Sequence, residues 1–350
     1  MSKAFKVELH TRDGQQLGFD CAPDENVLAA AARQGLSLPA MCRSGSCGVC
    51  RGHCQDGAIE LGPHSPEALS EADRQRGETL LCSSYPRSDL VVAVDVDLAG
   101  IQAPPPVERE ATVAVVEPVG GEVVNLVLLL SPDPNGDASV SFEVGQYMEL
   151  TLPDSGVTRA YSIANTPNWE GRLEFYIRLQ PEGHFSHWLR QAKAGDHLKI
   201  RGPFGHFSLD ESSLAPRWFV AGGTGLAPIL AMLRWMGEMG AMQPTRLYLG
   251  LNRESDRFAQ AELAGLQAIL PGLRQVLCVW HPQGEWQGFV GNPAEALQRD
   301  LAESLAAGKS PDIYLCGPPA MVAACEAVAS ALGLPAAKIH SERFLPSQIV

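Results

Sequence analysis

Apolar and polar positions alternate over several short stretches near the start of the chain. The segment "AFKVELHTRDGQQLGFDC" predicts two strands joined by a turn at Asp13 and Gly14, because Asp-Gly is a strong hairpin signal. The next segment, "DENVLAAAARQG", predicts a helix with Asp24 as its cap and Gly35 just beyond its end. Further on, the strand pattern "LVVAVDVD" runs into "LAGIQAPPPVERE", whose prolines predict a stiff linker between domains.

The pattern of apolar and polar residues differs between the middle of the chain and its C-terminal part. Residues 108–210 hold alternating strands separated by turn residues, which predicts an antiparallel barrel or sandwich. From about residue 215, short apolar runs such as "RWFVAGG" and "DIYLCG" are separated by helical stretches such as "PILAMLRWMGEMG", which predicts a parallel sheet with crossover helices. We therefore predict four segments: an N-terminal domain at 1–98, a linker at 99–107, a barrel domain at 108–210 and an α/β domain at 211–350.

Composition narrows the class of protein. The chain has 350 residues, 45% of them hydrophobic and 19% charged, and no apolar run long enough to span a membrane. The N-terminus lacks the apolar stretch of a secretory signal, so we expect a soluble, cytoplasmic protein. A net charge of −13 with no basic stripe makes nucleic acid an improbable partner. Nine cysteines in that compartment favour metal ligation over a disulfide framework.

Four cysteines have the spacing of a cluster site. Cys42, Cys47 and Cys50 form C-x4-C-x2-C, and 31 residues separate Cys50 from Cys82, close to the plant-type spacing for a [2Fe-2S] cluster. Small residues in the loop allow backbone N–H groups to turn toward the sulfurs. Zinc is the alternative, but it usually takes two C-x2-C-like knuckles, and this stretch holds only one.

The other cysteines need a separate interpretation. Cys54 extends the series to C-x2-C-x3-C, but no proline follows it as in the bacterial two-cluster pattern, so we expect a buried structural thiol. Cys21, Cys278 and Cys325 lie in apolar strand-like or helical settings and are expected to be small core residues.

Two groups of residues in the barrel segment suit a phosphate-bearing cofactor. Arg159, Tyr161 and Ser162 alternate along a predicted strand, "TRAYSIAN". Gly183 and Ser186 mark a turn that opens a predicted helix, and a helix N-terminus after glycine suits a pyrophosphate.

The α/β segment carries a dinucleotide signal. In "FVAGGTGLAPIL" a buried strand leads through a glycine-rich turn into a helix with Pro228 in its first turn. Pro228 stands where the usual G-x-G-x-x-G would have its third glycine. A second strand and turn, "YLCGPPAMV", puts Cys316 at a strand end, and Glu342 and Phe344 lie near the end of the chain.

In this order the motifs resemble the ferredoxin–flavin reductase family, and the resemblance covers essentially the whole chain. Within that family the chain looks most like the reductase components of soluble methane monooxygenase and related diiron alkane monooxygenases. The segments that carry this are "CRSGSCGVCRGHC", "SYPRSDL", "RAYSIANTPNWEGRLEFYIRLQPEGHFSHWLR", "FVAGGTGLAP", "VWHPQGEWQG", "PDIYLCGPPAM" and "ERFLPS". The resemblance implies a β-grasp ferredoxin domain, an antiparallel FAD barrel and a parallel-sheet NAD domain.

The resemblance also implies a role for each matching residue. Arg159 is expected to bind the FAD pyrophosphate, Tyr161 to pack on the flavin, and Ser162 to hydrogen-bond near its N5 atom. Cys54 is expected to be a neighbour of the cluster and not a ligand. The remaining matches are the cluster ligands Cys42, Cys47, Cys50 and Cys82, the second phosphate turn at Gly183 and Ser186, the nicotinamide-dinucleotide turn at Gly222, Gly223, Thr224 and Gly225, the segment beside the nicotinamide at Cys316 and Gly317, and an aromatic ring against the isoalloxazine at Phe344.

Three side chains are expected at the contact between flavin and nicotinamide. Ser162, Cys316 and Glu342 would act there as electrostatic and positioning groups. Another interpretation keeps Cys316 as simple packing at a strand end. Six residues follow Phe344, a departure from the family pattern that bears on whether its ring can be displaced.

The expected function is a conversion of two-electron into one-electron transfer, from NADH to FAD to [2Fe-2S] to the diiron hydroxylase of a separate oxygenase. The choice between NADH and NADPH depends on four charged residues, Arg253, Glu254, Asp256 and Arg257. A carboxylate there favours NADH, whereas an arginine favours a 2′-phosphate. The resemblance favours NADH. Residues 1–100 carry a net charge of −5, which suits a basic partner surface. The protein alone is expected to be monomeric. The alternatives are the reductase of an aromatic-ring dioxygenase or phenol hydroxylase, and a non-enzymatic iron–sulfur redox sensor.

Overall fold

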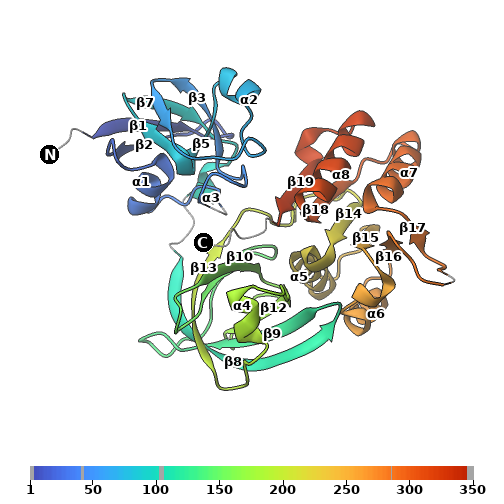
Figure 1. Ribbon diagram of the computed structural model, residues 1–350. Helices are drawn as coiled ribbons and strands as arrows, with labels where there is room; N and C mark the ends of the chain where they lie inside the picture. The colour runs from blue at the N-terminus through green and yellow to red at the C-terminus, as the bar shows by residue number, and fades with distance from the viewer. Residues whose placement is uncertain (1–3, 41–42, 102–105, 285, 345–350) are drawn as a thin grey trace. The chain divides into compact units, whose positions relative to one another are not determined.

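The protein is described by a computed structural model over residues 4–40, 43–101, 106–284 and 286–344 (Figure 1). It divides into two compact units. The N-terminal unit comprises residues 1–106 with 204–206, and the C-terminal unit comprises 107–203 with 207–350. Within the described ranges, no helix has both the length and the apolar character needed to cross a membrane.

The N-terminal unit is built on a mixed five-stranded sheet in the order β2-β1-β7-β3-β5. Strand β1 lies antiparallel to β2, which confirms the predicted hairpin, and parallel to β7. Apolar residues of β1, β7 and helix α1 share one core, and this β-grasp arrangement confirms the predicted fold. Its elements are β1 (Phe5–His10), β2 (Gln16–Cys21), α1 (Val27–Arg33), β3 (Arg51–Asp56), β4 (Ile59–Leu61), α2 (Glu71–Gln75), β5 (Glu78–Leu80), η1 (Leu81–Ser83), β6 (Ser84–Pro86), β7 (Leu90–Ala93) and α3 (Leu98–Ile101).

The start of α1 differs from the prediction. Asn26, and not Asp24, caps the helix: its side-chain oxygen accepts a hydrogen bond from the N–H of Ala29 at 2.8 Å. Both are good capping residues, so only the path of the chain decided between them. Gly35 lies just past the end of the helix with a φ of +78°, as predicted.

The first half of the C-terminal unit is a six-stranded antiparallel barrel in the order β11-β10-β13-β8-β9-β12. Beyond β11, the N–H of Ala164 donates to the carbonyl oxygen of Glu174 on β12 at 2.8 Å, which links the two edge strands. Of the barrel and the sandwich that the alternation predicted, the structure has the barrel, as the resemblance implied. Its elements are β8 (Val107–Gly120), β9 (Val123–Leu130), β10 (Tyr147–Thr151), β11 (Thr158–Ser162), β12 (Arg172–Arg178), α4 (His184–Leu189) and β13 (His197–Phe204).

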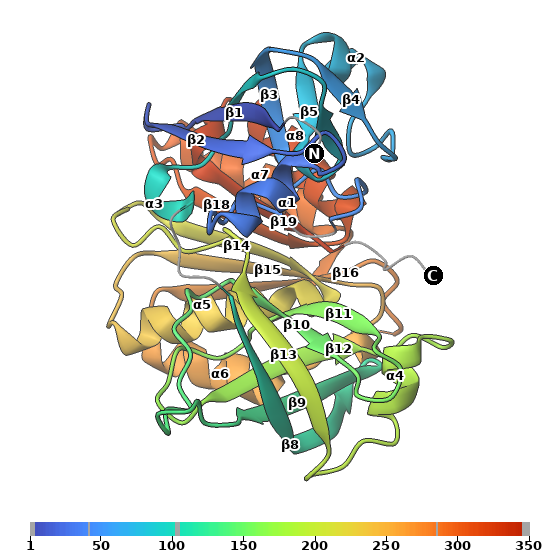
Figure 2. The same cartoon turned by 90° about the vertical axis from the view of Figure 1, so that its left-hand side faces the viewer.

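The second half is a six-stranded parallel sheet in the order β17-β16-β15-β14-β18-β19. Helices α5 and α6 cover one face and α7 and α8 cover the other (Figure 2), so each face has its own apolar core. The predicted α/β domain is confirmed. Its elements are β14 (Arg217–Gly222), η2 (Gly223–Gly225), α5 (Leu226–Glu238), β15 (Thr245–Leu251), η3 (Glu254–Asp256), α6 (Gln260–Ile269), β16 (Leu273–Val279), β17 (Phe289–Val290), α7 (Pro293–Ala306), β18 (Asp312–Gly317), α8 (Pro319–Ala331), η4 (Ala336–Lys338) and β19 (Ile339–Arg343).

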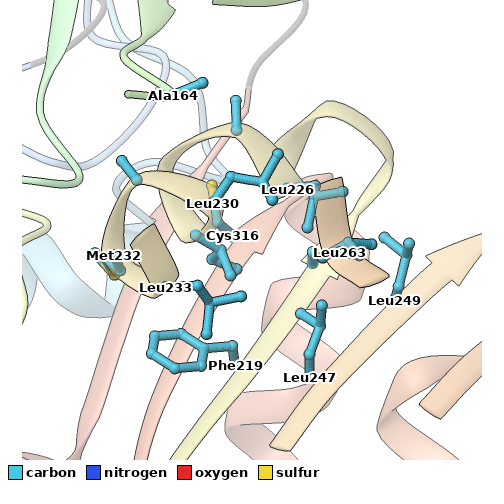
Figure 3. Packing of buried hydrophobic residues seen from close by; sticks show 14 of the residues in the cluster. Ala164, Phe219, Leu226, Leu230, Met232, Leu233, Leu247, Leu249, Leu263 and Cys316 are labelled. Atoms are coloured by element: carbon cyan, nitrogen blue, oxygen red, sulfur yellow. The ribbon is translucent and has the colours of Figure 1, made fainter. Parts of the chain in front are cut away.

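The barrel and the sheet contribute residues to one shared apolar cluster. Figure 3 shows Ala164, which follows β11, beside residues of α5 in the same apolar cluster. At this seam the guanidinium of Arg234 on α5 donates to the carbonyl oxygen of Ala164 at 2.7 Å and to the buried carboxylate of Glu174 at 3.0 Å. Side chains from both halves can therefore meet in a common site.

Candidate functional site

The cysteine loop packs on the N-terminal core, which includes Cys50 and Cys82. Cys47, Cys50 and Cys82 are 7%, 2% and 5% exposed, and the 3-10 turn η1 carries Cys82. The N–H of Leu81 donates to the carbonyl oxygen of Cys50 at 2.8 Å, which ties the fourth predicted ligand to the loop. Cys42, the first predicted ligand, lies outside the described residues.

A close backbone contact shapes this loop. Gly45 has a φ of +77°, and a Cβ on it would lie 2.4 Å from the carbonyl oxygen of Pro63. The N–H of Ser65 donates to the carbonyl oxygen of Gly45 at 3.0 Å, and the hydroxyl of Ser83 donates to that of Pro63 at 2.9 Å. Segment 63–65 is therefore held against the loop at Gly45, where a side chain would clash with its backbone.

The thiols are suited to a metal cluster. A hydrogen bond with Cys82, burial and the proximity of Cys47 raise the pKa of the Cys50 thiol, because several thiolates in one buried place repel each other. Iron removes that cost by binding thiolates. Among the described residues, no three metal-ligating side chains are placed so that they could hold a single metal ion. A [2Fe-2S] cluster does not need such a group, because its four cysteines are distributed over two irons.

Cys54 differs from the prediction that it is buried. It lies on β3 at a bulge and is half-exposed, with its thiol donating to the carbonyl oxygen of Asp56 at 3.4 Å. Cys21, Cys278 and Cys325 are buried in the apolar cores, as predicted.

The predicted flavin residues lie on β11. Arg159 and Tyr161 are two positions apart and so share a face of the strand, while Ser162 lies on the other face and is itself buried. The Arg159 guanidinium donates to the carbonyl oxygen of its neighbour Thr158 at 2.8 Å, which leaves donors available for a phosphate. Burial raises the pKa of Tyr161, so its hydroxyl stays neutral.

The second predicted phosphate turn lies beside this strand. The ring of Tyr161 is 5.1 Å, centroid to centroid, from that of Phe185 on α4, directly before Ser186. Gly183 is the N-cap of α4, as predicted. The hydroxyl of Ser186 is buried and accepts from the N–H of Gln180 at 2.8 Å, so it holds the turn and keeps its own proton to donate.

The predicted nicotinamide-dinucleotide turn follows β14. Gly222, Gly223, Thr224 and Gly225 link this strand to α5, at the carboxyl edge of the parallel sheet. A Cβ on Gly225 would lie 2.2 Å from the carbonyl oxygen of Cys316, so this turn packs backbone to backbone against the end of β18. Gly317 follows at that strand end. Such an edge, with glycine backbone open to a ligand, suits a dinucleotide.

The three predicted reaction-site side chains meet in a buried position. Glu342 lies opposite Cys316 in the parallel pairing of β18 and β19, and both are buried. The hydroxyl of Ser162 donates to the Glu342 carboxylate at 3.4 Å, and the Cys316 thiol lies 4.0 Å from the same oxygen. Burial raises the pKa of Glu342 to about 8, and the Ser162 hydroxyl opposes part of that rise. This carboxyl can therefore hold a proton near neutral pH.

Phe344 follows β19 immediately. Its N–H donates to the carbonyl oxygen of Gly317 at 2.8 Å, and its ring is half-buried against the apolar core of the C-terminal unit. The six residues after it lie outside the described part of the chain. The sequence pattern did not reveal β19, because it is a short edge strand with polar residues.

Arg178 is a residue that the sequence pattern did not single out. It ends β12 of the barrel, is exposed, and has a guanidinium nitrogen 3.9 Å from where a Cβ on Gly223 would lie. A cation facing the glycine-rich turn suits the phosphates of a dinucleotide. The signal in the sequence was an arginine at the end of the strand pattern "RLEFYIR".

Three family models match consecutive parts of the chain. A 2Fe-2S iron-sulfur cluster binding domain matches residues 10–87, an oxidoreductase FAD-binding domain matches 112–209, and an oxidoreductase NAD-binding domain matches 219–327. Together with the fold, they define an iron–sulfur flavoprotein oxidoreductase that uses a nicotinamide coenzyme. The predicted cofactor set is confirmed at the level of domains.

Similar proteins span the whole length. The reductase component of propane 2-monooxygenase from Mycolicibacterium goodii is 32% identical, with 98% of each chain covered. The electron transfer component of toluate 1,2-dioxygenase from Pseudomonas putida is 34% identical, covering 98% of this chain and 99% of its own. Among solved structures, the Amycolatopsis cytochrome P450 reductase GcoB is 30% identical, with a TM-score of 0.78 over 98% of this chain and 100% of its own. The chain belongs to the family of ferredoxin–FAD–NAD reductases that serve as reductase components of multicomponent oxygenases.

Proposed function

We propose that this chain is the NADH-dependent reductase of a soluble diiron monooxygenase that hydroxylates methane or short-chain alkanes. The observation that carries the electron-transfer part is the buried meeting of Ser162, Cys316 and Glu342 between a flavin-type barrel and a dinucleotide turn. The cytoplasm is the proposed compartment, since nine cysteines in one chain suit metal ligation better than a disulfide framework, and a monomer is the proposed state of the protein alone.

The cofactors supply the redox chemistry: NADH gives hydride, FAD accepts two electrons and releases them singly, and a [2Fe-2S] cluster carries one. The chain binds and orients them. Arg159 and Ser186 would hold the FAD phosphates, Tyr161 would pack on the ring system, and Arg178 with the turn 222–225 would hold the coenzyme phosphates.

Around the reacting atoms, the proposed work of the protein is to position groups and exclude water. Ser162 orients the Glu342 carboxyl, and the buried Cys316 closes the same space from the end of β18. Phe344 would lie against the flavin ring system. The proposed cluster ligands are Cys42, Cys47, Cys50 and Cys82.

An anaerobic NADH titration tests the electron route. We expect loss of flavin absorbance, followed by a rhombic EPR signal from the one-electron reduced cluster. A protein that binds FAD but neither bleaches with NADH nor reduces a dye would be a redox sensor, and the proposal would be wrong.

A matched pair of thiols tests the reaction site. Cys316 and Cys325 are both fully buried in the C-terminal unit, so Cys316→Ala and Cys325→Ala should lose similar stability. Only Cys316→Ala should slow NADH-driven dye reduction. Equal rates in the two variants would mean that Cys316 is a packing residue.

The identity of the acceptor needs its own experiment. Relatives that serve propane monooxygenases and relatives that serve aromatic dioxygenases match at 32% to 34% identity over the full length, which supports a second candidate, the reductase of an aromatic-ring dioxygenase or phenol hydroxylase. Reconstitution with each purified oxygenase, followed by NADH-coupled product formation, separates them. Product with the diiron alkane hydroxylase alone supports the first proposal, and product with an aromatic oxygenase alone overturns it.

The charge of the N-terminal unit supports an acidic docking face. Nine lysine and arginine residues stand against fourteen aspartate and glutamate residues in residues 1–100. Transfer to a basic hydroxylase surface should therefore slow as salt rises. A rate that does not change with ionic strength would exclude electrostatic steering.

A further inference from the structure

The loop after β15 is the part of the sheet edge that would meet the ribose of the coenzyme. It runs from Asn252 to Ala259 at the carboxyl end of the strand next to β14, where the second strand of a dinucleotide fold carries its ribose-binding residues. Its charged side chains interact with other groups of the same loop. The N–H of Arg253 donates to the carboxylate of Asp256 at 3.1 Å, and Arg257 pairs with Glu254 at 3.5 Å.

A turn of the barrel lies directly against this loop. Strands β8 and β9 are joined at Gly120, Gly121 and Glu122, whose φ values of +108°, +57° and +57° are all in the left-handed region. A Cβ on Gly121 would lie 2.6 Å from the carbonyl oxygen of Asp256, and one on Gly120 would lie 2.8 Å from that of Arg257. Real Cβ atoms do not come so close, so the turn and the loop backbone are in full contact.

Two further contacts keep the turn and the loop in place. The ring of Phe258, which is 2% exposed, lies 5.3 Å from that of Tyr176 on β12, centroid to centroid. The carbonyl oxygen of Glu122 accepts from the N–H of Leu179 at 2.7 Å, which ties the turn to the end of the same strand. The loop is therefore anchored on the barrel at its end and along its backbone.

We propose that the β8–β9 turn, through Gly120 and Gly121, positions the Glu254–Arg257 pair and so sets the affinity for the coenzyme and the preference for NADH over NADPH. This inference rests on the proposed use of NADH. A carboxylate accepts hydrogen bonds from free ribose hydroxyls, whereas a guanidinium attracts a 2′-phosphate, so the balance depends on where the loop backbone holds each group. The turn acts through the loop and does not touch the coenzyme.

The test compares Gly121→Ala with Gly136→Ala in the full-length, cofactor-loaded protein. Gly136 lies in another barrel loop and has a φ of +87°, and a Cβ placed on it would have no atom within 4 Å, so its variant reproduces the backbone strain without the contact. We expect Gly121→Ala to raise the KM for NADH about tenfold and to lower the NADH-to-NADPH ratio of kcat/KM by a similar factor. Its kcat at saturating NADH should stay within about twofold of the wild type, because Ser162, Cys316 and Glu342 are untouched.

Phe258→Leu is the second variant, in case the alanine variant does not fold. It removes the ring contact with Tyr176 but keeps an apolar side chain, and it should raise the KM in the same direction by a smaller factor. If neither variant moves KM or the coenzyme ratio more than Gly136→Ala does, the turn is only structural and the inference is wrong. Failure of the wild-type protein to reduce any acceptor with NADH would instead defeat the proposed function.

Discussion

The cysteine loop and the Ser162–Cys316–Glu342 site are assembled in different ways. The three proposed cluster ligands that the structure describes are Cys47, Cys50 and Cys82. They lie within 36 residues of one another, and two of them come from a single loop. Ser162 and Glu342 are 180 residues apart and meet through the packing of a barrel strand on the edge of a parallel sheet. The first site depends on one local backbone shape, whereas the second depends on the whole C-terminal unit. This difference between the two sites predicts which substitutions should have large effects and which should have small ones.

The largest effect should follow from removing a proposed cluster ligand. Cys82→Ser should lose or badly destabilise the cluster, measured by iron content and by the EPR signal of the reduced protein, because a serine hydroxyl is a much poorer ligand for iron than a thiolate. Flavin-dependent reduction of a dye by NADH should persist, since the C-terminal unit is unchanged. Cys54→Ser is the control and should keep the cluster; loss in Cys54→Ser and retention in Cys82→Ser would reverse our ligand assignment.

The next effect tests the local shape of the loop. Gly45→Ala puts a methyl group into the backbone of Pro63 and His64 and should strongly reduce cluster content per protein. Gly35→Ala is its match, because Gly35 has almost the same φ, +78°, and open space around it. Both variants carry about 1–2 kcal/mol of backbone strain. Equal cluster content in the two would show that the contact with segment 63–65 is dispensable.

A smaller effect is expected at the non-local site. Glu342→Ala should slow hydride transfer from NADH to the flavin about a hundredfold in stopped-flow absorbance, since the orientation of the site is lost. Glu342→Gln keeps the hydrogen bond with Ser162, so its rate of hydride transfer should fall much less. Cluster content is the internal control and should not change in either variant. Similar rates for Ala and Gln would mean that no hydrogen bond is needed there.

The smallest effect is a dependence on pH. Burial raises the pKa of Glu342 from its ordinary 4.5 to about 8, so the folded protein favours the neutral carboxyl. The stabilisation from this neutral group is fully present below about pH 4.5 and is lost as pH rises through about 8. Between pH 7 and 9 the wild type should lose thermal stability and dye-reduction rate relative to Glu342→Gln, which cannot ionise. Parallel profiles for the two proteins would contradict the raised pKa.

Much of the fold could be predicted because its signals are local. Alternation gave the strands of the barrel, the Asp13-Gly14 turn gave the first hairpin, and apolar runs between helices gave the parallel sheet. The errors were also local. Asn26 caps α1 in place of Asp24, because both residue types suit a helix N-cap and the path of the chain after β2 decides which of them takes it. Cys54 is half-exposed although it packs against the N-terminal core, and it lies at a bulge in β3 that no spacing rule contains.

By itself, the sequence determined the order of the domains, the cysteine spacing, the glycine turns and the cofactors they suit, because each of these depends on residues that are close along the chain. Only the tertiary structure decided that β19 pairs beside β18, that Glu342 is buried against Ser162 and Cys316, that Arg178 faces the glycine-rich turn, and that a barrel turn rests on the ribose loop. These depend on packing between segments far apart in the chain, and burial, which raises the pKa of Glu342, exists only once that packing has formed.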